Sequence, residues 1–231
     1  MTILRVIGDL HGDYSVYHNL VNRSCDYSVQ LGDFGFDYSI LQNLDSDCHS
    51  IVLGNHSNYD IAFTYPHILG NFRNVYQGPF EFFFVRGAFS IDKEPRLSYE
   101  RNTGHKVWWK EEELTQLEGN MALNHYEKYK PKVMMTHEAP NDLCKMMSNK
   151  DMLRMFDIDE NYESSTQILL QQMLEIHSPK LWLFGHWHRH RMLIYKSTTF
   201  ICVGEKEYID FDENWNIVGG SHLTKLAEQV Q

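Results

Sequence analysis

Short apolar runs alternate with amphipathic stretches over the first third of the chain. A buried strand is expected where branched and aromatic residues cluster, and a helix where apolar residues recur every three or four positions. This pattern predicts strands at Ile3–Ile7, Tyr27–Leu31 and Ser50–Leu53, with helices at Tyr14–Arg23 and Tyr38–Leu44 between them. The resulting β-α-β-α-β order implies parallel strands joined by right-handed crossovers, as in an α/β protein.

The middle of the chain has a different pattern. Two apolar runs, Asn74–Tyr76 and Phe80–Arg86, flank a Gly-Pro turn pair and predict a β-hairpin. The polar stretch Asp92–Lys106 predicts a loop. After it, Lys110–Tyr129 predicts a helix, because the run of glutamates near its beginning suits a helix N-terminus.

The last third returns to strands and helices. Strands are predicted at Lys132–Thr136 and Leu181–Phe184, with a helix at Thr166–Ile176 between them. The remaining apolar runs predict a closing antiparallel set of strands at Arg191–Tyr195, Thr199–Val203 and Glu207–Phe211. The tail Ser221–Gln231 is predicted to be a short helix or frayed.

The length of 231 residues suits one α/β domain with a sizeable core, so we expect a single domain over residues 1–231. The middle of the chain would supply a hairpin and a cap-like insertion at about residues 58–130. A formal net charge of −10 disfavours a long nucleic acid as partner, because non-specific binding of nucleic acid needs a broad basic surface.

The apolar runs are too short to span a membrane, and the first of them meets Gly-Asp at once, so neither a signal peptide nor a membrane partner is expected. The cysteines are widely spaced and form no CxxC pair, which favours free thiols in a reducing cytoplasm. They are Cys25, Cys48, Cys144 and Cys202.

Polar residues that can bind metals follow five of the predicted strands, at the point where each strand ends. Ligands of open α/β sheets bind beyond the carboxyl ends of the strands, so these side chains are expected to meet at one edge. The glycines among them allow sharp turns and a close approach to an ion. The runs are Gly8-Asp9-Leu10-His11-Gly12, Gly32-Asp33-Phe34-Gly35, Gly54-Asn55-His56, Thr136-His137-Glu138 and Gly185-His186-Trp187-His188.

Carboxylates and imidazoles together suit divalent metals such as manganese, iron or zinc. The candidate ligands outnumber the positions around one tetrahedral ion, whereas two ions about 3.5–4 Å apart that share a carboxylate would use them all. Such a pair lowers the pKa of bound water and holds the oxygens of a phosphoryl group in line. Any one of these motifs alone is typical of a plain turn, and only their joint placement after strands favours a metal site.

The ordered motifs resemble those of the calcineurin-like metallophosphoesterase superfamily: GDxHG, GDxx[D/N], GNH[E/D], an isolated histidine and GHxH, between residues 8 and 188. The resemblance implies a four-layer sandwich of two mixed β-sheets flanked by helices, and two divalent metal ions. Manganese is expected, with iron, zinc and nickel as alternatives. The implied ligands are Asp9, His11 and His188 for one ion and Asn55, His137 and His186 for the other, with Asp33 bridging.

The resemblance also implies that His56 lies outside the metal shell and either donates a proton to the leaving oxygen or stabilises the transition state. The sequence departs from the family pattern nearby. Phe36 stands at the second acidic position, which is followed by Asp37, and Ser57 replaces the acidic residue after His56. Tyr38 stands where the protein phosphatase branch has an arginine. We therefore expect small-molecule or nucleotide esters as substrates, and the partner that orients His56 stays open.

The predicted activity is hydrolysis of a phosphomonoester or phosphodiester by a metal-bridging hydroxide. Phosphate needs cations besides the metals, and Arg96 in the polar stretch is a candidate substrate-binding residue. Three alternatives stay open. They are a nuclease or cyclic-nucleotide phosphodiesterase on the same scaffold, a non-catalytic metal-binding interaction module such as the retromer subunit of this superfamily, and a structural zinc protein.

Overall fold

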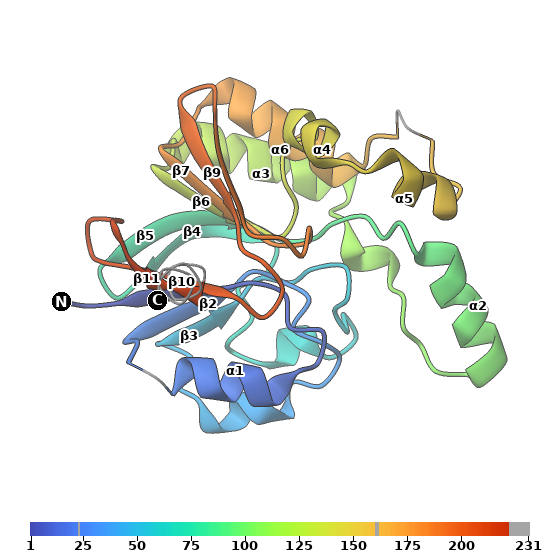
Figure 1. The fold of residues 1–231 in the computed structure, drawn as a ribbon, viewed down its shortest axis with the longest axis horizontal. Helices are drawn as coiled ribbons and strands as arrows, with labels where there is room; N and C mark the ends of the chain where they lie inside the picture. The colour runs from blue at the N-terminus through green and yellow to red at the C-terminus, as the bar shows by residue number, and fades with distance from the viewer. Residues whose placement is uncertain (23, 160–161, 222–231) are drawn as a thin grey trace, which may run out of the picture.

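The structure of the chain, a computed structural model, describes residues 1–22, 24–159 and 162–221. Within these residues the strands form two sheets that lie face to face, with helices on both outer sides (Figure 1). This arrangement confirms the α/β class and the four-layer sandwich of two mixed sheets flanked by helices. The predicted tail Ser221–Gln231 lies, apart from its first residue, outside the described part of the chain.

The first sheet follows the β-α-β-α-β order predicted for the beginning of the chain. Its elements are β1 (Leu4–Ile7), α1 (Tyr14–Val21), β2 (Tyr27–Gln30), the short 3₁₀ helix η1 (Ser39–Asn43), β3 (His49–Ile51), β10 (Tyr208–Phe211) and β11 (Ile217–Gly220). β1, β2 and β3 are parallel, as predicted, and β10 lies antiparallel to β1 on its other side. The strand order is β11-β10-β1-β2-β3.

The second sheet has six strands in the order β4-β5-β6-β7-β9-β8. They are β4 (Phe72–Gln77), β5 (Phe80–Val85), β6 (Val133–Thr136), β7 (Leu181–Phe184), β8 (Arg191–Tyr195) and β9 (Thr198–Cys202). The predicted hairpin is confirmed, since β4 and β5 pair antiparallel. β5, β6, β7 and β9 are parallel neighbours, so their carboxyl ends meet at one edge.

The predicted closing antiparallel set is wrong in part. β8 and β9 do pair antiparallel, but β9 also pairs in parallel with β7. The next strand, β10, leaves this sheet and joins β1 in the first sheet. The apolar pattern of a strand records that it is buried, and carries no information on which sheet buries it.

The remaining elements lie on the outer faces and beside the sheets. They are η2 (Ala62–Thr64), α2 (Lys93–Thr103), η3 (Lys110–Glu112), α3 (Gln116–Tyr129), α4 (Asn141–Met147), α5 (Lys150–Met155) and α6 (Ser165–Ile176). α3, α4 and α6 cover the second sheet, whereas α1 covers the first (Figure 1). α2 lies to one side of both sheets, next to the edge where the parallel strands end (Figure 1).

The loop predicted at Asp92–Lys106 is wrong, because most of it forms α2. This helix has no apolar face, and its buried residue is a charged one, Arg96. It ends at Gly104, whose φ of 73° suits a left-handed helix cap. A helix that packs through an arginine leaves no apolar periodicity in the sequence.

The predicted helix at Lys110–Tyr129 begins later than expected. Thr115 and Glu118 form a reciprocal capping box that starts α3 at Gln116. The glutamates taken as the N-terminus lie in and after η3, where Glu112 is buried against Ser90. α4, α5 and β11 were not predicted at all.

Alternation along β5 shows how the sandwich is held together. Phe82 and Phe84 point between the two sheets, where they pack with residues such as Leu4 of β1. Phe83 points to the opposite face and packs against Tyr126 of α3. Each buried phenylalanine contributes about 1.5–3 kcal/mol relative to an exposed one. The core therefore fixes the two sheets so that their parallel strands end at the same edge.

Candidate metal centre

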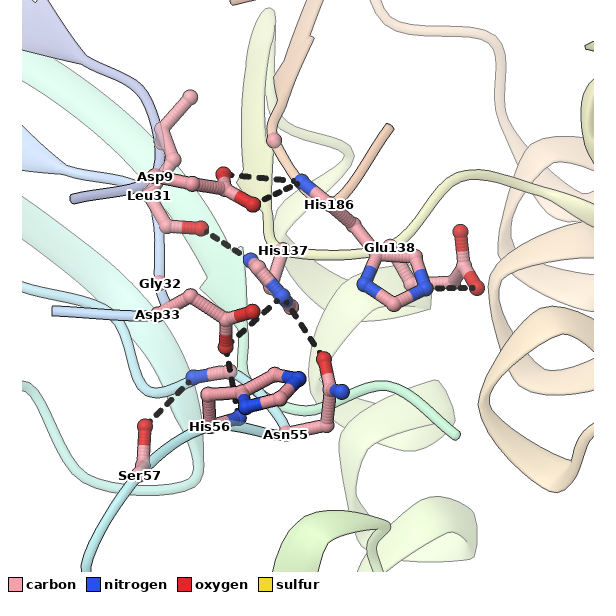
Figure 2. A network of polar contacts seen from close by, with 12 residues as sticks. Asp9, Leu31, Gly32, Asp33, Asn55, His56, Ser57, His137, Glu138 and His186 are labelled. Carbon is pink, nitrogen blue, oxygen red and sulfur yellow. Dashed lines mark hydrogen bonds and ion pairs between the residues drawn. The ribbon is translucent and has the colours of Figure 1, made fainter. Parts of the chain in front are cut away.

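The structure brings together all of the residues predicted to bind metal, at the carboxyl ends of the parallel strands. Asp9 and His11 follow β1, Asp33 follows β2, and Asn55 follows β3. The second sheet contributes the residues after β6 and β7, which are His137, His186 and His188. Figure 2 shows Asp9, Asp33, Asn55, His137 and His186 at this edge, with the ring of His137 between Asp33 and Asn55 and the ring of His186 turned toward Glu138. Ligand atoms within 4.8 Å of one another define an outer group (Asp9, His11, Asp33, His188) and an inner group (Asp33, His137, His186).

The backbone at this edge adopts conformations that side chains other than glycine seldom take. His11, Asp33, His186 and His188 have φ angles of 47°, 53°, 66° and 53°. Such angles cost free energy and persist only where the surrounding structure enforces them, which occurs most often at functional sites. Here they turn the chain sharply after β1, β2 and β7, so that the motifs after these strands face the same place.

Close packing of the turns makes one glycine indispensable. A Cβ atom added at Gly32 would lie 2.2 Å from Nδ1 of His137, and the φ of Gly32 is 107°. Both facts exclude a larger residue at this position. Gly32 therefore leaves the space that the ring of His137 occupies, although His137 follows a distant strand, β6.

Asp33 lies between the two groups. Its side chain is 1% exposed, and Oδ1 accepts a hydrogen bond from the backbone N–H of His56 at 2.7 Å. Oδ1 also lies 3.2 Å from Nε2 of His137, whereas Oδ2 lies 4.0 Å from Nε2 of His11. The two carboxylate oxygens thus face different histidines.

In the outer group, Asp9 is fully buried and the histidines are exposed. Oδ2 of Asp9 lies 3.2 Å from Nε2 of His188 and 3.9 Å from Nε2 of His11. The two Nε2 atoms are 2.9 Å apart. The backbone N–H of His186 donates to both oxygens of Asp9, at 3.0 and 3.1 Å, and this fixes the carboxylate. A hydrogen bond to Asp9 raises the pKa of His188.

In the inner group, acceptor atoms crowd around one ring nitrogen. Nδ1 of His137 lies 2.7 Å from the carbonyl oxygen of Leu31, to which it donates. Nε2 faces Oδ1 of Asp33 at 3.2 Å and Oδ1 of Asn55 at 3.1 Å. Burial opposes protonation, yet the carboxylates of Asp33 and Asp9 raise the pKa of His137 to about 9. These atoms therefore need a positive charge among them, from a proton or from a metal ion.

Glu138 follows His137 in its motif, but the sequence analysis predicted no role for it. It is 1% exposed, and its carboxylate lies 3.6 Å from Nε2 of His186. Burial opposes its ionisation, but His186 and hydrogen bonds from Ala139, Gln167 and Trp187 hold the pKa of Glu138 below its usual value. Burial also lowers the pKa of His186. A carboxylate behind a metal-binding histidine commonly fixes the orientation of the ring.

A buried polar network supports Asn55 from the side of α2. Nδ2 of Asn55 donates to Oγ of Ser90 at 3.1 Å, so that Oδ1 faces His137. Ser90 accepts from Arg96 at 2.7 Å and donates to Glu112 at 2.6 Å. Arg96 also donates to the carbonyl oxygen of Asn55 at 3.3 Å. Ser90 and Glu112 had no counterpart in the motifs, because their partners lie in other segments of the chain.

His56 borders the site, with its side chain 29% exposed. Its ring centroid is 5.1 Å from that of His11, and its Nε2 lies 3.7 Å from Oδ2 of Asp92. Burial lowers the pKa of His56. Asp92 directly precedes α2, so the carboxylate that faces His56 comes from the segment predicted as a loop.

The residues that depart from the family pattern have other contacts. Phe36 packs against Trp109, with ring centroids 5.4 Å apart. Asp37 is exposed and accepts a hydrogen bond from the backbone N–H of Ser39 at 2.8 Å, at the start of η1. Oγ of Ser57 accepts from the backbone N–H of Gly54 at 3.1 Å and supports the turn after β3.

Residues 3–190 match the calcineurin-like phosphoesterase family, and the chain belongs to this family. The resemblance drawn from the motifs is thereby confirmed. No curated protein is similar enough in sequence to count as a match.

Several solved structures are similar to this chain. A protein of Thermus thermophilus has a TM-score of 0.50 at 10% identity, over 95% of this chain and 98% of that one. The phosphopantetheinyl hydrolase of Mycobacterium tuberculosis has a TM-score of 0.46 at 12% identity, over 89% and 90%. A Streptococcus pneumoniae protein described as a predicted phosphoesterase has a TM-score of 0.41 at 14% identity, over 91% and 83%. At these identities the similarity concerns the fold.

Two further expectations can be compared with the structure. Among the described residues, no helix is both long enough and apolar enough to cross a membrane. The cysteines, which all lie in the described part of the chain, are free.

Proposed function

We propose that the protein is a dinuclear metal-dependent phosphoesterase that hydrolyses a phosphomonoester or phosphodiester of a small molecule or nucleotide. The observation that carries this proposal is the position of Asp33 in both the inner and the outer group. A carboxylate that belongs to two sets of ligands supports a pair of ions rather than one. The membership of the chain in the calcineurin-like phosphoesterase family supports the same chemistry.

The proposed ligands divide between the two groups. One ion would be held by Asp9, His11 and His188, and the other by Asn55, His137 and His186, with Asp33 shared. Because Nε2 of His186 faces Glu138, this histidine would offer Nδ1 to the metal. The mixture of carboxylate, imidazole and amide oxygen suits manganese first, and iron, zinc or nickel as alternatives.

The donor set fits a cation on physical grounds. Nε2 of His137 lies within hydrogen-bonding distance of the Oδ1 atoms of Asp33 and Asn55, and both oxygens are acceptors only. A metal ion would replace the proton on Nε2 and satisfy all three atoms. Metal binding should therefore release a proton.

Bound at this edge, divalent ions would lower the pKa of water and offset the charge of the phosphoryl group. We propose that His56 gives a proton to the leaving oxygen, because its ring lies at the border of the site and remains partly exposed. Burial lowers its pKa, and Asp92 lies 3.7 Å from Nε2, where it would hold the ring in one orientation. Asp92 would thus take the place of the acidic residue that the motif lacks.

The segment at about residues 58–130 is proposed to act as a cap over the site, since it contributes Asp92 and the network behind Asn55. Arg96 remains a predicted substrate-binding residue. Its contacts with Ser90 and with the backbone of Asn55 favour an effect through Asn55. Arg96→Ala with unchanged turnover and substrate affinity would remove Arg96 from either role.

Metal reconstitution tests the proposal. Protein treated with a chelator and dialysed should take up two equivalents of Mn²⁺ per chain, measured by elemental analysis. It should then hydrolyse bis(p-nitrophenyl) phosphate or p-nitrophenyl phosphate. A single equivalent would contradict the dinuclear site. Two equivalents without turnover of mono-, di- or cyclic phosphate esters would favour the non-catalytic interaction module.

The same assay distinguishes the nuclease, cyclic-nucleotide phosphodiesterase and structural zinc functions. Hydrolysis of single-stranded DNA or of a cyclic nucleotide in preference to the aryl esters would favour the nuclease or cyclic-nucleotide phosphodiesterase. One tightly held zinc ion, with unfolding on chelation, would indicate a structural zinc protein.

A further inference from the structure

A cavity adjoins the outer group, between the segment that leads into β8 and the end of α4. His188, Arg189 and Arg191 form one side of it, and Met147 and Asn149 lie on another. The cavity holds about 1060 Å³, including space open to solvent. Because His188 belongs both to the outer group and to the wall of this cavity, a substrate bound at the metal centre can extend into it.

We propose that this cavity binds a second anionic group of the substrate, a phosphate or a carboxylate, apart from the phosphoryl group that reacts at the metal centre. The proposal rests on the phosphoesterase function proposed above and names the class of substrate. Three features carry it: the charge of the lining, the free guanidinium groups and the position of Arg191 relative to the metal centre.

The lining of the cavity is positively charged, although the chain as a whole is acidic. Arg189 and Arg191 line it, and none of its lining residues is an aspartate or a glutamate. The formal net charge of the chain is −10. A guanidinium group stays protonated in proteins, and its planar fork of N–H donors matches the paired oxygens of phosphate and carboxylate. The cavity therefore favours an anion over a neutral or cationic group.

The two guanidinium groups are available to a ligand. Among the described residues, neither Arg189 nor Arg191 has a side-chain hydrogen bond or an ion pair, and both are exposed. Arg5 shows the contrast, because its guanidinium group is already paired with Asp210 at 2.8 Å. A ligand in the cavity does not have to displace a carboxylate of the protein before it binds these arginines.

The register of the second sheet places Arg191 close to the metal centre. Arg191 lies opposite Cys202 of β9, and Cys202 lies beside Phe184, the last residue of β7. Neighbouring strands are about 4.8 Å apart, so the backbone of Arg191 is roughly 10 Å from the end of β7, which His186 follows. Directly opposite side chains share a face, and Cys202 also lines the cavity. This separation suits two anionic groups of one small molecule.

Titration of metal-free protein with simple anions tests the cavity separately from catalysis. Calorimetry of chelator-treated, dialysed protein at low ionic strength should show binding of inorganic phosphate or of malonate. The variant with both Arg189→Gln and Arg191→Gln should bind that anion about tenfold more weakly. Lys196→Gln removes a positive charge at an exposed position just past the opposite end of β8, and should bind the anion as the unaltered protein does. The anion that binds more tightly identifies the group as phosphate or carboxylate.

Turnover of matched esters tests the same cavity in the Mn²⁺-loaded protein. For a second phosphate, adenosine 3′,5′-bisphosphate should exceed adenosine 5′-monophosphate about tenfold in kcat/KM, through a lower KM. For a carboxylate, 3-phosphoglycerate should exceed glycerol 3-phosphate by a similar factor. The double arginine variant should lose the preference, whereas Lys196→Gln should keep it.

Two outcomes would overturn the proposal. One is that neither anion binds to the unaltered protein, or that the double variant binds them equally well. The other is that neither pair of esters shows a preference that depends on the two arginines. Hydrolysis of the p-nitrophenyl esters reports on the phosphoesterase function by itself, and the anion titration needs no turnover, so failure of one is distinguishable from failure of the other.

Discussion

The inner and outer groups of the candidate metal centre use similar ligands in different surroundings. In the inner group, the side chains of Asp33 and His137 are 1% and 0% exposed. In the outer group, those of His11 and His188 are 26% and 46% exposed. Solvent can satisfy the outer histidines when no ion is bound. The inner acceptors depend on a charge supplied within the protein.

The difference in burial implies a difference in metal binding. Solvent-exposed ligands retain rotational freedom and lose it on binding, whereas His137 is already fixed by its bond to Leu31. Asn55 is similarly fixed by Ser90. We therefore expect the inner group to hold its ion more tightly than the outer group. Four predictions test this comparison; the two on turnover come first and the two on stability follow, each pair in order of decreasing effect.

Substitution of the shared residue should disable both groups at once. Asp33→Asn removes the negative charge between the two sets of histidines, and turnover of the aryl esters should fall on the order of 10³-fold. Metal content should fall below two equivalents by elemental analysis. Asp37→Asn is the matched control, because Asp37 is exposed and lies in the next turn. Full activity in Asp33→Asn would exclude a shared carboxylate.

Removal of the proposed proton donor should affect turnover and spare both groups. His56→Ala should lower kcat about 10²-fold, because a leaving alkoxide loses its proton source, while metal content stays near that of the unaltered protein. His18→Ala on the exposed surface of α1 serves as control. Asp92→Asn should have a smaller effect of the same kind. Loss of metal from His56→Ala would mean that His56 is a ligand.

Substitution of one histidine in each group should show that the buried group contributes more to stability than the exposed group. His137→Ala should lower the free energy of unfolding in chelator by about 3–5 kcal/mol, since it leaves the buried Asp33 carboxylate without its charged partner. His188→Ala, at an exposed position, should change it by less than about 1 kcal/mol. Urea unfolding measures both. Equal losses of stability would contradict the contrast between a buried and an exposed group.

The last prediction concerns how the free energy of unfolding depends on pH through Glu112, which belongs to the buried polar network that supports Asn55. Burial raises the pKa of Glu112 to about 7 from its usual 4.5. Because the folded-state pKa lies above the unfolded-state value, the protonated carboxyl stabilises the fold below pH 4.5. This contribution is lost as the pH rises through 7. The loss amounts to about 3 kcal/mol.

Glu112→Gln stays neutral, so its free energy of unfolding should lack this decline between pH 4.5 and 7. Urea unfolding over this range in chelator measures the difference. Glu111→Gln, at the exposed neighbouring position, should keep the decline of the unaltered protein. The same decline in all three proteins would show that Glu112 does not titrate in this range.

The sequence predicted the site best where the motif lies close to the end of the strand that positions it. Each proposed ligand lies within a few residues of the end of an apolar strand, so the pattern and the role of the residue are close together in the sequence. The prediction failed at α2, which packs through Arg96 and has no apolar face. It also failed for β10, whose apolar pattern suits either sheet.

The sequence by itself determined the parallel strands and the ligand motifs at their ends, and the family then followed from the order of these motifs. The division into buried and exposed groups was decided by tertiary structure alone. So were Asp92 facing His56, Glu138 behind His186, and the network behind Asn55. The physical reason is that burial and hydrogen bonding depend on segments far apart in the chain. Such contacts leave no periodic trace in the sequence and exist only once the two sheets have packed.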